Sequence, residues 1–480
     1  MLKKLLISVI LILVAYFAIN STNFIDKLKN NFLSKDQKQL IKRYFLPYKV
    51  ISQQKDYILE LEKEISKKKR NINSFIYTAE IDFKESSANI KTKKKELISL
   101  SDNKTMIKYD IASGFYTGIF GERPGGYFDF HKDNLFILSA RGILSYTDDL
   151  DKLYFQQIKN NINEFINFNN FKKQKHKDSK IILNNPQLWN STVMPRDLLI
   201  HDDKIYISYV EEIDLNCWNL SVMHGKIDYE TIKFEKLFSF NKCDGSNNPR
   251  YSNQTGGRIV YFDKNHILLS VGVLGDDDLA QNLESIKGKI IKINLNNSDY
   301  EIISMGHRNP QGLLFDNEQN YILATEHGPR GGDEINLIDI NEIDQNKPIN
   351  FGWAIASAGE HYCFRDFGKT KEPCATKYAN FPLYKSHSKH GFVEPLISFV
   401  PSIAISEISK IGKKKYVVGG MGHNREGDKS LHYFELNNEN KITNLKRVKV
   451  FNRVRDMLYK DNKLYLFFEE PSSIGVIPFE

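Results

Sequence analysis

Two loops of the chain gather residue types that could bind an anionic or quinone-like ligand. Residues 306–312 read Gly-His-Arg-Asn-Pro-Gln-Gly, and residues 326–336 read Glu-His-Gly-Pro-Arg-Gly-Gly-Asp-Glu-Ile-Asn. Arg308 offers a planar fork of N–H donors that suits a carboxylate or a quinone oxygen, and Asn309 supplies both a donor and an acceptor. These two side chains are therefore the first candidates for ligand binding.

The second loop could also hold a hard cation. Gly328 has no side chain and Pro329 has a fixed φ, so the backbone can turn its carbonyl oxygens toward one point. Asp333 and Glu334 add two carboxylates nearby, and Ca²⁺ prefers oxygen ligands of these kinds. Each of these residues alone is better explained as a turn residue or a surface ion pair. Taken together, they indicate a site.

Such loops must be positioned by strands, and a pattern that recurs six times identifies those strands. Each copy is a polar turn followed by three apolar residues, and Asp and Asn favour tight turns. The apolar triplets are residues 135–137, 205–207, 267–269, 321–323, 416–418 and 464–466. Six such hairpins predict an all-β, six-bladed β-propeller over residues 75–480, with its polar loops converging at one mouth. Residues 153–179 break the pattern and are predicted to be an insertion.

These stretches together resemble the glucose/sorbosone dehydrogenase family, the soluble quinoprotein aldose dehydrogenases. The similarity covers about residues 190–470 and is strongest over residues 250–360. It includes the Gly257-Arg258 pair and the two loops described above, and it resumes at Arg-Val-Arg-Asp, residues 453–456. The resemblance implies a six-bladed propeller that binds pyrroloquinoline quinone (PQQ) and calcium.

The resemblance also implies roles for individual residues. The quinone would be contacted by Arg308, Asn309, Arg453 and Arg455, and calcium would be held by the backbone carbonyls of Gly328 and Pro329. Because PQQ is a tricarboxylate, the three arginines could each bind a carboxylate through two N–H groups. Calcium and Arg308 would stabilise negative charge that develops on the quinone.

The chain departs from the family at the position of the general base. The family has a His a few residues before the Gly-Arg pair, whereas this chain has Gln254, preceded by Asn253. An amide is essentially non-basic, so Gln254 cannot take the proton of a sugar hydroxyl. Loss of a positioned base typically lowers a rate by about 10²- to 10⁴-fold. A cofactor-contacting Lys of the family also lacks a clear counterpart in the stretch that contains His423 and Arg425.

Three further residues of these loops are interpreted as structural. His307 and His327 stand at ordinary positions of the two motifs, and we expect them to support the loops rather than to act on a substrate. Trp353, in Asn-Phe-Gly-Trp, is expected to pack in the interior rather than to stack on a sugar.

The four cysteines fall in two close pairs, Cys217 with Cys243 and Cys363 with Cys374. In an oxidising compartment, pairing between near neighbours is the simplest arrangement, although four cysteines allow three connectivities. A four-cysteine metal site is the alternative, but no two of them have the C-x-x-C spacing. We therefore predict local disulfides in an exported protein.

The N-terminal end predicts membrane attachment. Lys3 and Lys4 precede an apolar run over residues 5–19, as in a signal anchor or signal peptide, and the end of that run matches a cleavage site poorly. We expect residues 1–22 to form an anchor helix, with a cleaved signal as the alternative. The lysines would remain cytoplasmic, and the rest of the chain would face the periplasm or the cell exterior.

Positive charge is concentrated behind this anchor. The chain has a net charge of +8, and residues 25–75 alone hold 13 Lys and Arg against 6 Asp and Glu. Residues 23–74 are interpreted as a basic helical stalk. The remainder is close to neutral, so the composition gives no reason to expect a nucleic-acid partner.

Two functions fit these observations. The first is a membrane-anchored quinoprotein oxidoreductase that oxidises a sugar or related alcohol by hydride transfer to PQQ and passes electrons to a respiratory acceptor, with water or another base in place of the missing His. The second is a non-catalytic propeller that acts as a binding or assembly module. The fold is common to both, so it cannot choose between them. The retained Arg308, Arg453 and Arg455 favour the first.

Overall fold

The chain divides into two compact units, Met1–Phe75 and Ile76–Glu480, in the computed structural model. The structure describes Tyr57, Ile58 and Leu61, which are helical, and residues 90–111, 126–139, 142–152, 154–166, 195–214, 217–245, 254–344, 347–362, 372–422, 429–469 and 473–479. The predicted anchor and the rest of the predicted stalk lie outside these residues. No helix within the described ranges is both long enough and apolar enough to cross a membrane.

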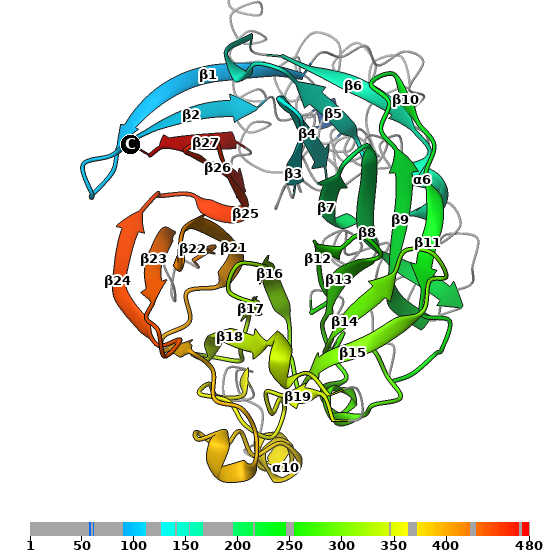
Figure 1. The fold of residues 1–480 in the computed structure, drawn as a ribbon, viewed down its shortest axis with the longest axis vertical. Helices are drawn as coiled ribbons and strands as arrows, with labels where there is room; N and C mark the ends of the chain where they lie inside the picture. Colours follow the sequence, from blue (N-terminus) through cyan, green and yellow to red (C-terminus); the bar gives the residue numbers. More distant parts are fainter. Residues whose placement is uncertain are drawn as a thin grey trace, which may run out of the picture. The chain divides into compact units, whose positions relative to one another are not determined.

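The described part of the second unit forms six blades of antiparallel strands around a central axis, and Figure 1 shows the first strand of each blade nearest that axis. Blade 1 consists of β3 (Gly126–His131), β4 (Asn134–Ser139), β5 (Leu144–Thr147) and β6 (Tyr154–Asn160). Blade 2 consists of β7 (Pro195–His201), β8 (Lys204–Asp214), β9 (Cys217–Lys226) and β11 (Glu235–Ser239). Blade 3 consists of β12 (Gly256–Asp263), β13 (His266–Val271), β14 (Lys289–Asn294) and β15 (Tyr300–Met305).

Blades 4 to 6 follow the same plan. Blade 4 consists of β16 (Pro310–Asp316), β17 (Tyr321–Glu326), β18 (Asp333–Asp339) and β20 (Ile397–Phe399). Blade 5 consists of β21 (Ile405–Gly412), β22 (Lys415–Gly420), β23 (Ser430–Leu436) and β24 (Ile442–Lys449). Blade 6 consists of β25 (Arg453–Lys460), β26 (Lys463–Glu469), β27 (Ser473–Pro478) and, from the start of the propeller, β2 (Thr105–Ile111). The prediction of an all-β, six-bladed propeller is confirmed.

A few short elements decorate the blades. Two-residue strands extend two of the sheets in parallel: β10 (Thr231–Ile232) pairs with β6, and β19 (Ile349–Asn350) pairs with β15. Helix α6 (Ile162–Phe165) follows β6, and helix α10 (Glu372–Asn380) lies in the long connection between β19 and β20.

The ring is closed by a strand from the start of the propeller. β2 pairs with β27, so that Ile107 lies opposite Val476, and it completes the blade that the C-terminal strands begin. β1 (Ile90–Ser99) pairs with both β2 and β6 and thereby joins the outer edges of blades 6 and 1. Closure of this kind covers strand edges that could otherwise pair with another chain.

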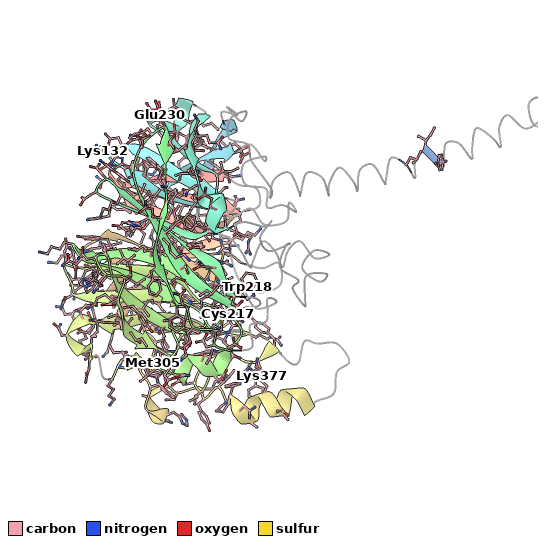
Figure 2. All side chains as sticks on the ribbon, turned by 90° about the vertical axis from the view of Figure 1, so that its right-hand side faces the viewer. Lys132, Cys217, Trp218, Glu230, Met305 and Lys377 are labelled. Carbon is pink, nitrogen blue, oxygen red and sulfur yellow. A yellow bond between two sulfur atoms is a disulfide. The ribbon has the colours of Figure 1, made fainter. Side chains whose placement is uncertain are left out.

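The six turns predicted from the repeat all join the first strand of a blade to its second strand. Because neighbouring strands run in opposite directions, these turns lie on one face, and the next turn of each blade lies on the other face. Figure 2 shows this arrangement with Lys132, in the β3–β4 turn, and Cys217, at the start of β9, toward opposite faces.

The predicted insertion over residues 153–179 was wrong at its beginning. β6 (Tyr154–Asn160) is the fourth strand of blade 1, where Leu144 pairs with Ile158. Ile158 is fully buried, and Gln156 and Gln157 pair with β5; four of the seven residues of this strand are polar, so the alternation that marks a strand was hidden. Residues 167–179 lie outside the described residues.

The described residues form seven hydrophobic clusters, six of which each lie between two neighbouring blades; the seventh contains Val273, Ala280 and Trp353. The second strands have buried neighbours on both faces, and every residue of β17 is buried for this reason. Blades 3 and 4, for example, meet where Leu268 and Ile290 pack with Leu313 and Ile322. Burial of such side chains contributes about 1.5–3 kcal/mol each, so the blades stabilise one another as a ring.

One buried arginine connects four of the blades at the axis. Nη1 of Arg258 (β12) lies 2.9 Å from Asp197 Oδ1 (β7) and 2.8 Å from Asp456 Oδ1 (β25). Its Nε lies 2.7 Å from Glu407 Oε2 (β21). We call these four side chains the hub. All four are at least 90% buried, which makes the attraction between them much stronger than at a surface.

The hub carboxylates also bind the backbone of adjacent blades. Asp197 Oδ2 accepts a hydrogen bond from Ile259 N–H at 2.8 Å, and Asp456 Oδ2 accepts one from Phe128 N–H at 2.9 Å. Glu407 Oε1 similarly accepts one from Leu313 N–H at 3.2 Å. The hub thus has a contact in all six blades.

The predicted disulfide between Cys217 and Cys243 is confirmed. It joins the start of β9 to the segment that follows β11, within blade 2. Cys363 and the side chain of Cys374 lie outside the described residues, so their pairing stays a prediction.

The hub predicts that the free energy of unfolding falls as the pH rises. Burial raises the pKa of Asp197 to about 7 and that of Glu407 to about 8; Arg258 opposes both shifts and Asp456 adds to them. One guanidinium can balance the charge of only one of the three buried carboxylates, so the folded protein keeps protons on the others until about pH 7 to 8, whereas unfolded carboxyls lose theirs near pH 4; folding therefore takes up protons. The resulting stabilisation is complete below about pH 4 and is lost as the pH rises through about 7 to 8. Thermal denaturation at several pH values measures this slope.

Glu407→Gln removes one titrating group and should make the decline between about pH 6 and pH 8 shallower, because each group contributes at most about 1.4 kcal/mol per pH unit. Glu284→Gln is the matched control, since the side chain of Glu284 is 80% exposed. An equal decline in both variants would contradict the assignment to the hub.

Candidate functional site

The predicted site residues lie on the face opposite the six hairpin turns. There the connections between blades enter the innermost strands, with β12 beginning at Gly256, β16 at Pro310, β21 at Ile405 and β25 at Arg453. β17 ends on the same face at Glu326. We call this face, near the axis, the mouth. Loops that are distant in sequence therefore meet in one place.

Arg308 is buried beside the loop that follows β17. Its Nη1 donates to the carbonyl oxygens of His327 and Gly328, at 2.9 and 2.7 Å. Its own backbone is fixed as well, because its N–H donates to Glu326 Oε2 at 3.2 Å and its carbonyl accepts from Val273 N–H at 2.9 Å. The first candidate ligand-binding residue thus holds two loops together.

Trp353 provides a flat surface beside Arg308. The guanidinium lies 5.3 Å from the centre of the indole, within the range of a cation–π interaction. Trp353 Nε1 donates to Asp277 Oδ1 at 3.0 Å, and Asp277 Oδ2 lies 3.4 Å from Lys377 Nζ of α10, a residue labelled in Figure 2. Trp353 is 4% exposed, so it packs in the interior as predicted.

Asn309 belongs to a hydrogen-bonded chain that crosses three blades. Its Oδ1 accepts from Gly256 N–H at 3.2 Å and from Gln311 Nε2 at 2.9 Å. Gln311 Oε1 in turn accepts from Arg455 Nη1 at 3.1 Å. The structure therefore brings Asn309 and Arg455 into one network, as the sequence motifs suggested.

Arg453 and Arg455 share one buried carboxylate, Glu469. Arg453 Nε lies 2.9 Å from Glu469 Oε2, and Arg455 Nε lies 2.6 Å from Oε1. Burial opposes ionisation, but the two arginines lower the pKa of Glu469 and keep it negative. Arg453 Nη1 also donates to the carbonyls of Met421 and Gly422, at 2.6 and 2.8 Å. Arg453 therefore bonds mainly to the protein itself.

Gln254 enters the mouth just before β12. Its backbone carbonyl accepts from Leu274 N–H at 2.9 Å. A Cβ on Gly272 would stand 2.2 Å from that carbonyl, so only glycine permits this approach. The side-chain Oε1 of Gln254 is buried and receives no hydrogen bond from the described residues. Leaving such an acceptor unsatisfied costs about 1–3 kcal/mol, which suits a position where a ligand donates.

The two carbonyls predicted to hold a cation accept hydrogen bonds from the protein. Gly328 O accepts from Arg308, and Pro329 O accepts from Gly332 N–H at 3.2 Å and from Ser402 Oγ at 3.4 Å. A cation on Gly328 O would stand close to the positive guanidinium, and the two would repel each other. Cation binding therefore requires Arg308 to move away from this carbonyl.

The two predicted carboxylate ligands also have partners. Asp333 accepts from the backbone N–H groups of Gly328 at 3.2 Å and Ile405 at 3.0 Å. Glu334 is buried beside Glu326, and burial together with that neighbouring charge raises the pKa of Glu334. Within the described ranges, no group of three His, Cys, Asp or Glu side chains is arranged to hold a metal ion.

His307 is a buried residue that supports the loop of Arg308. It is fully buried, with Nε2 2.8 Å from Ser304 Oγ and Nδ1 3.2 Å from Glu326 Oε2. Since Glu326 also binds the backbone of Arg308, His307 helps to position the arginine. The structural interpretation of His307 agrees with these contacts.

Sequence reasoning missed three residues of the mouth. Gln311 lies inside the first motif, but nothing marked it as the link to Arg455. Glu469 is the last residue of β26, a mostly apolar strand, and carries no motif. Arg196 of β7 forms an Arg-Asp dipeptide with Asp197, and the same dipeptide occurs at Arg455 in β25. That recurrence was the available signal for Arg196.

The contact between Trp353 and Asp277 predicts coupled effects on stability. Trp353→Phe removes the donor to a largely buried carboxylate, so we expect the free energy of unfolding to fall by about 1–3 kcal/mol. Asp277→Ala should also destabilise the protein, and the double variant should lose about 0.5–3 kcal/mol less than the sum of the single losses. Urea denaturation of the four proteins measures this difference. Additive losses would show that the hydrogen bond does not contribute.

Comparison with known proteins identifies the family that this chain matches and several similar proteins. The family model for glucose/sorbosone dehydrogenase matches residues 193–474, more than half of the chain. An aldose sugar dehydrogenase of Escherichia coli is 30% identical over 177 residues, 33% of this chain and 44% of that protein. Quinoprotein glucose dehydrogenase B of Acinetobacter calcoaceticus is 28% identical over 199 residues, 35% of this chain and 38% of that protein. The matched regions thus span less than half of either relative.

Solved structures share the fold. The soluble aldose sugar dehydrogenase of Escherichia coli in its apo form has a TM-score of 0.53 and 21% identity, over 73% of this chain and 94% of its own. The PQQ-bound aldose sugar dehydrogenase of Streptomyces coelicolor has a TM-score of 0.51 and 15% identity, over 81% and 99%. Because the family model matches most of the propeller, the chain belongs to the glucose/sorbosone dehydrogenase family.

Proposed function

We propose that the protein is a quinoprotein oxidoreductase that oxidises a sugar or a related alcohol with PQQ. The observation that carries this proposal is that hydrogen bonds join Asn309, Gln311 and Arg455, and that Arg308 directly precedes Asn309, so guanidinium and amide groups from blades 4 and 6 meet at one mouth. Family membership supports it, as do a relative named aldose sugar dehydrogenase and another named quinoprotein glucose dehydrogenase.

The residues of the mouth fit PQQ chemically. Arg308 and Arg455 offer N–H donors to carboxylate and quinone oxygens, and the amide nitrogen of Asn309 is a further donor. Bound PQQ would supply a two-electron acceptor for hydride. The contribution of the protein is then to bind and orient: Trp353 orients Arg308, and Gln311 holds Asn309 and Arg455 together.

Gln254 gives the proposed reaction an unusual feature. Its buried Oε1 can accept a hydrogen bond from a substrate hydroxyl and orient it, but the amide cannot take the proton. We therefore propose that water or another base accepts the proton, and that turnover is slower than with a His at this position.

Calcium forms a second part of the proposal, taken from the family resemblance. The carbonyls of Gly328 and Pro329 would be its protein ligands. As the structure stands these residues do not form a ready cation site, because Arg308 bonds to Gly328 O and Asp333 bonds to two backbone N–H groups. Calcium would bind only together with a ligand that draws Arg308 away.

Membrane attachment and export are also proposed. The lysines and apolar run at the N-terminus indicate an anchor that leaves the propeller facing the periplasm or the cell exterior, where a respiratory chain could accept electrons. The disulfide between Cys217 and Cys243 supports an oxidising compartment.

A non-catalytic binding module is the second candidate function. The observation in its favour is that Arg453 bonds to Glu469 and to two backbone carbonyls, so one of the three arginines expected to bind the cofactor has a structural role. Gln254 in place of a base points the same way.

Titration of the purified full-length chain with PQQ, with and without calcium, tests the proposal. We expect binding at micromolar PQQ or below, a raised melting temperature, and tighter binding with calcium. Arg308→Met should weaken binding by about 10- to 100-fold, because it removes a charge-assisted pair of hydrogen bonds. Arg447→Met is the matched control, since Arg447 is exposed on β24, the outermost strand of blade 5. Absence of binding at micromolar PQQ would favour the non-catalytic module.

Restoring a base predicts a gain of activity. Gln254→His places an imidazole where the family has its base, so turnover of aldoses by the PQQ-loaded protein should rise by about 10²-fold or more. Gln254→Asn is the control, because it keeps an amide. If turnover stays unchanged in the His variant while PQQ remains bound, the assignment of this position to proton transfer is wrong.

A further inference from the structure

The innermost strands of blades 2 and 6 carry the same dipeptide in the same place. Asp197 in β7 and Asp456 in β25 both bind Nη1 of Arg258, so the two strands are in register with respect to the hub. The residues before them are Arg196 and Arg455. The pairing register shifts at both arginines, between Pro195 and Asp197 in β7 and between Val454 and Asp456 in β25, so each stands at a β-bulge one residue nearer the mouth.

The surroundings of Arg196 connect it to the mouth. β7 packs between β3 and β12, and these innermost strands also stand side by side in Figure 1. The side chain of Arg196 lies on Gly257, where an added Cβ would stand 2.3 Å from Arg196 Cβ. The preceding residue, Gly256, donates its N–H to Asn309. Arg196 therefore borders the polar network of the proposed site.

Positive charge is also concentrated around Tyr127. Tyr127 of β3 is near both Arg196 and Arg455, whose positive charges act on its hydroxyl. Burial lowers the pKa of Arg196 to about 10, with Tyr127 opposing the shift and Arg455 adding to it, so Arg196 is still a cation at neutral pH. Two partly buried cations, from the strands on either side of β3, favour an anion between or above them.

Arg453 is poorly placed to bind such an anion. Its Nε and Nη1 bond to Glu469 and to the carbonyls of Met421 and Gly422, and its side chain is 10% exposed. A ligand would have to displace a carboxylate and two carbonyls from Arg453, which is more than at Arg308, where two carbonyls are bound, or at Arg455, where Glu469 and the Gln311 amide are bound. Arg196 borders the network itself, because its side chain lies on Gly257.

We propose that Arg196, rather than Arg453, is the third arginine of the mouth and binds a carboxylate of the ligand together with Arg455. This inference rests on the proposed function for the identity of the ligand. The carboxylate belongs either to PQQ or to an acidic sugar substrate such as an aldonate. Both have the same chemistry at the guanidinium, a bidentate hydrogen-bonded ion pair.

Arg196→Met in the full-length protein tests this assignment. Without a substrate present, PQQ titration followed by absorbance should give a dissociation constant about 10- to 100-fold higher than that of the unchanged protein if Arg196 binds a cofactor carboxylate. If it binds the substrate instead, PQQ affinity stays the same, and the melting-temperature increase caused by gluconate is lost while that caused by glucose is kept. Unchanged responses to PQQ and to gluconate would overturn the proposal.

Three controls make the result specific. Arg447→Met removes an exposed arginine of β24 and should change neither response. Arg453→Met should affect the melting temperature of the ligand-free protein more than PQQ affinity, because its bonds are internal; a larger loss of PQQ affinity than in Arg196→Met would contradict the exchange of roles. Arg196→Lys keeps the charge without the planar fork, so a loss of about 3- to 10-fold is expected, and it replaces the Met variant if that variant does not fold.

The outcomes also separate this inference from the proposed function. If the unchanged protein binds no PQQ, the quinoprotein proposal fails. The gluconate measurement still tests Arg196 in that case. A gluconate effect that disappears in Arg196→Met supports a carboxylate site without the quinone, and a gluconate effect that persists, or is absent from the unchanged protein as well, overturns it.

Discussion

The ion pairs of Arg258 are the interaction on which the rest of the molecule depends. One guanidinium meets carboxylates from blades 2, 5 and 6, and these carboxylates reach the backbone of the adjacent blades. In a propeller each blade contacts only its neighbours through its flat faces, so the axis is where distant blades can be set against one another. Because breaking a buried ion pair leaves an uncompensated charge, the hub fixes the blades in one arrangement.

The hub also determines where side chains of the mouth lie. Asp197 and Asp456 place Arg196 and Arg455, and the Gln311 side chain connects Arg455 to Asn309. Most of these donors bond within the protein, which keeps side chains with many rotamers in place before a ligand arrives. A ligand that uses them must offer acceptors at least as good as the carbonyls and the carboxylate it displaces, so anionic oxygens are favoured over neutral ones.

The sequence predicted what depends on neighbouring residues. The six turns follow from Asp, Asn and Gly in short polar segments, and the loops at residues 306–312 and 326–336 were found because their functional groups are close together in the chain. The hub, Glu469 and Arg196 were not found, since each matters only through a partner in another blade. Arg453 was assigned to the ligand from its motif, and only the three-dimensional contacts show that it bonds to Met421, Gly422 and Glu469.

The pairing of β2 with β27, which closes the ring, affects how the protein folds during synthesis. β2 is among the first parts of the propeller to be synthesised, and its partner β27 is the last. A chain that emerges from a ribosome or crosses a membrane in order must therefore hold five blades and the open edge of the β1–β2 hairpin until β27 appears. Closing so long a loop is slow, and open strand edges invite aggregation in the meantime. Chaperones that cover exposed edges would act on this protein during that interval, and a chain cut short before β27 would remain an open ring.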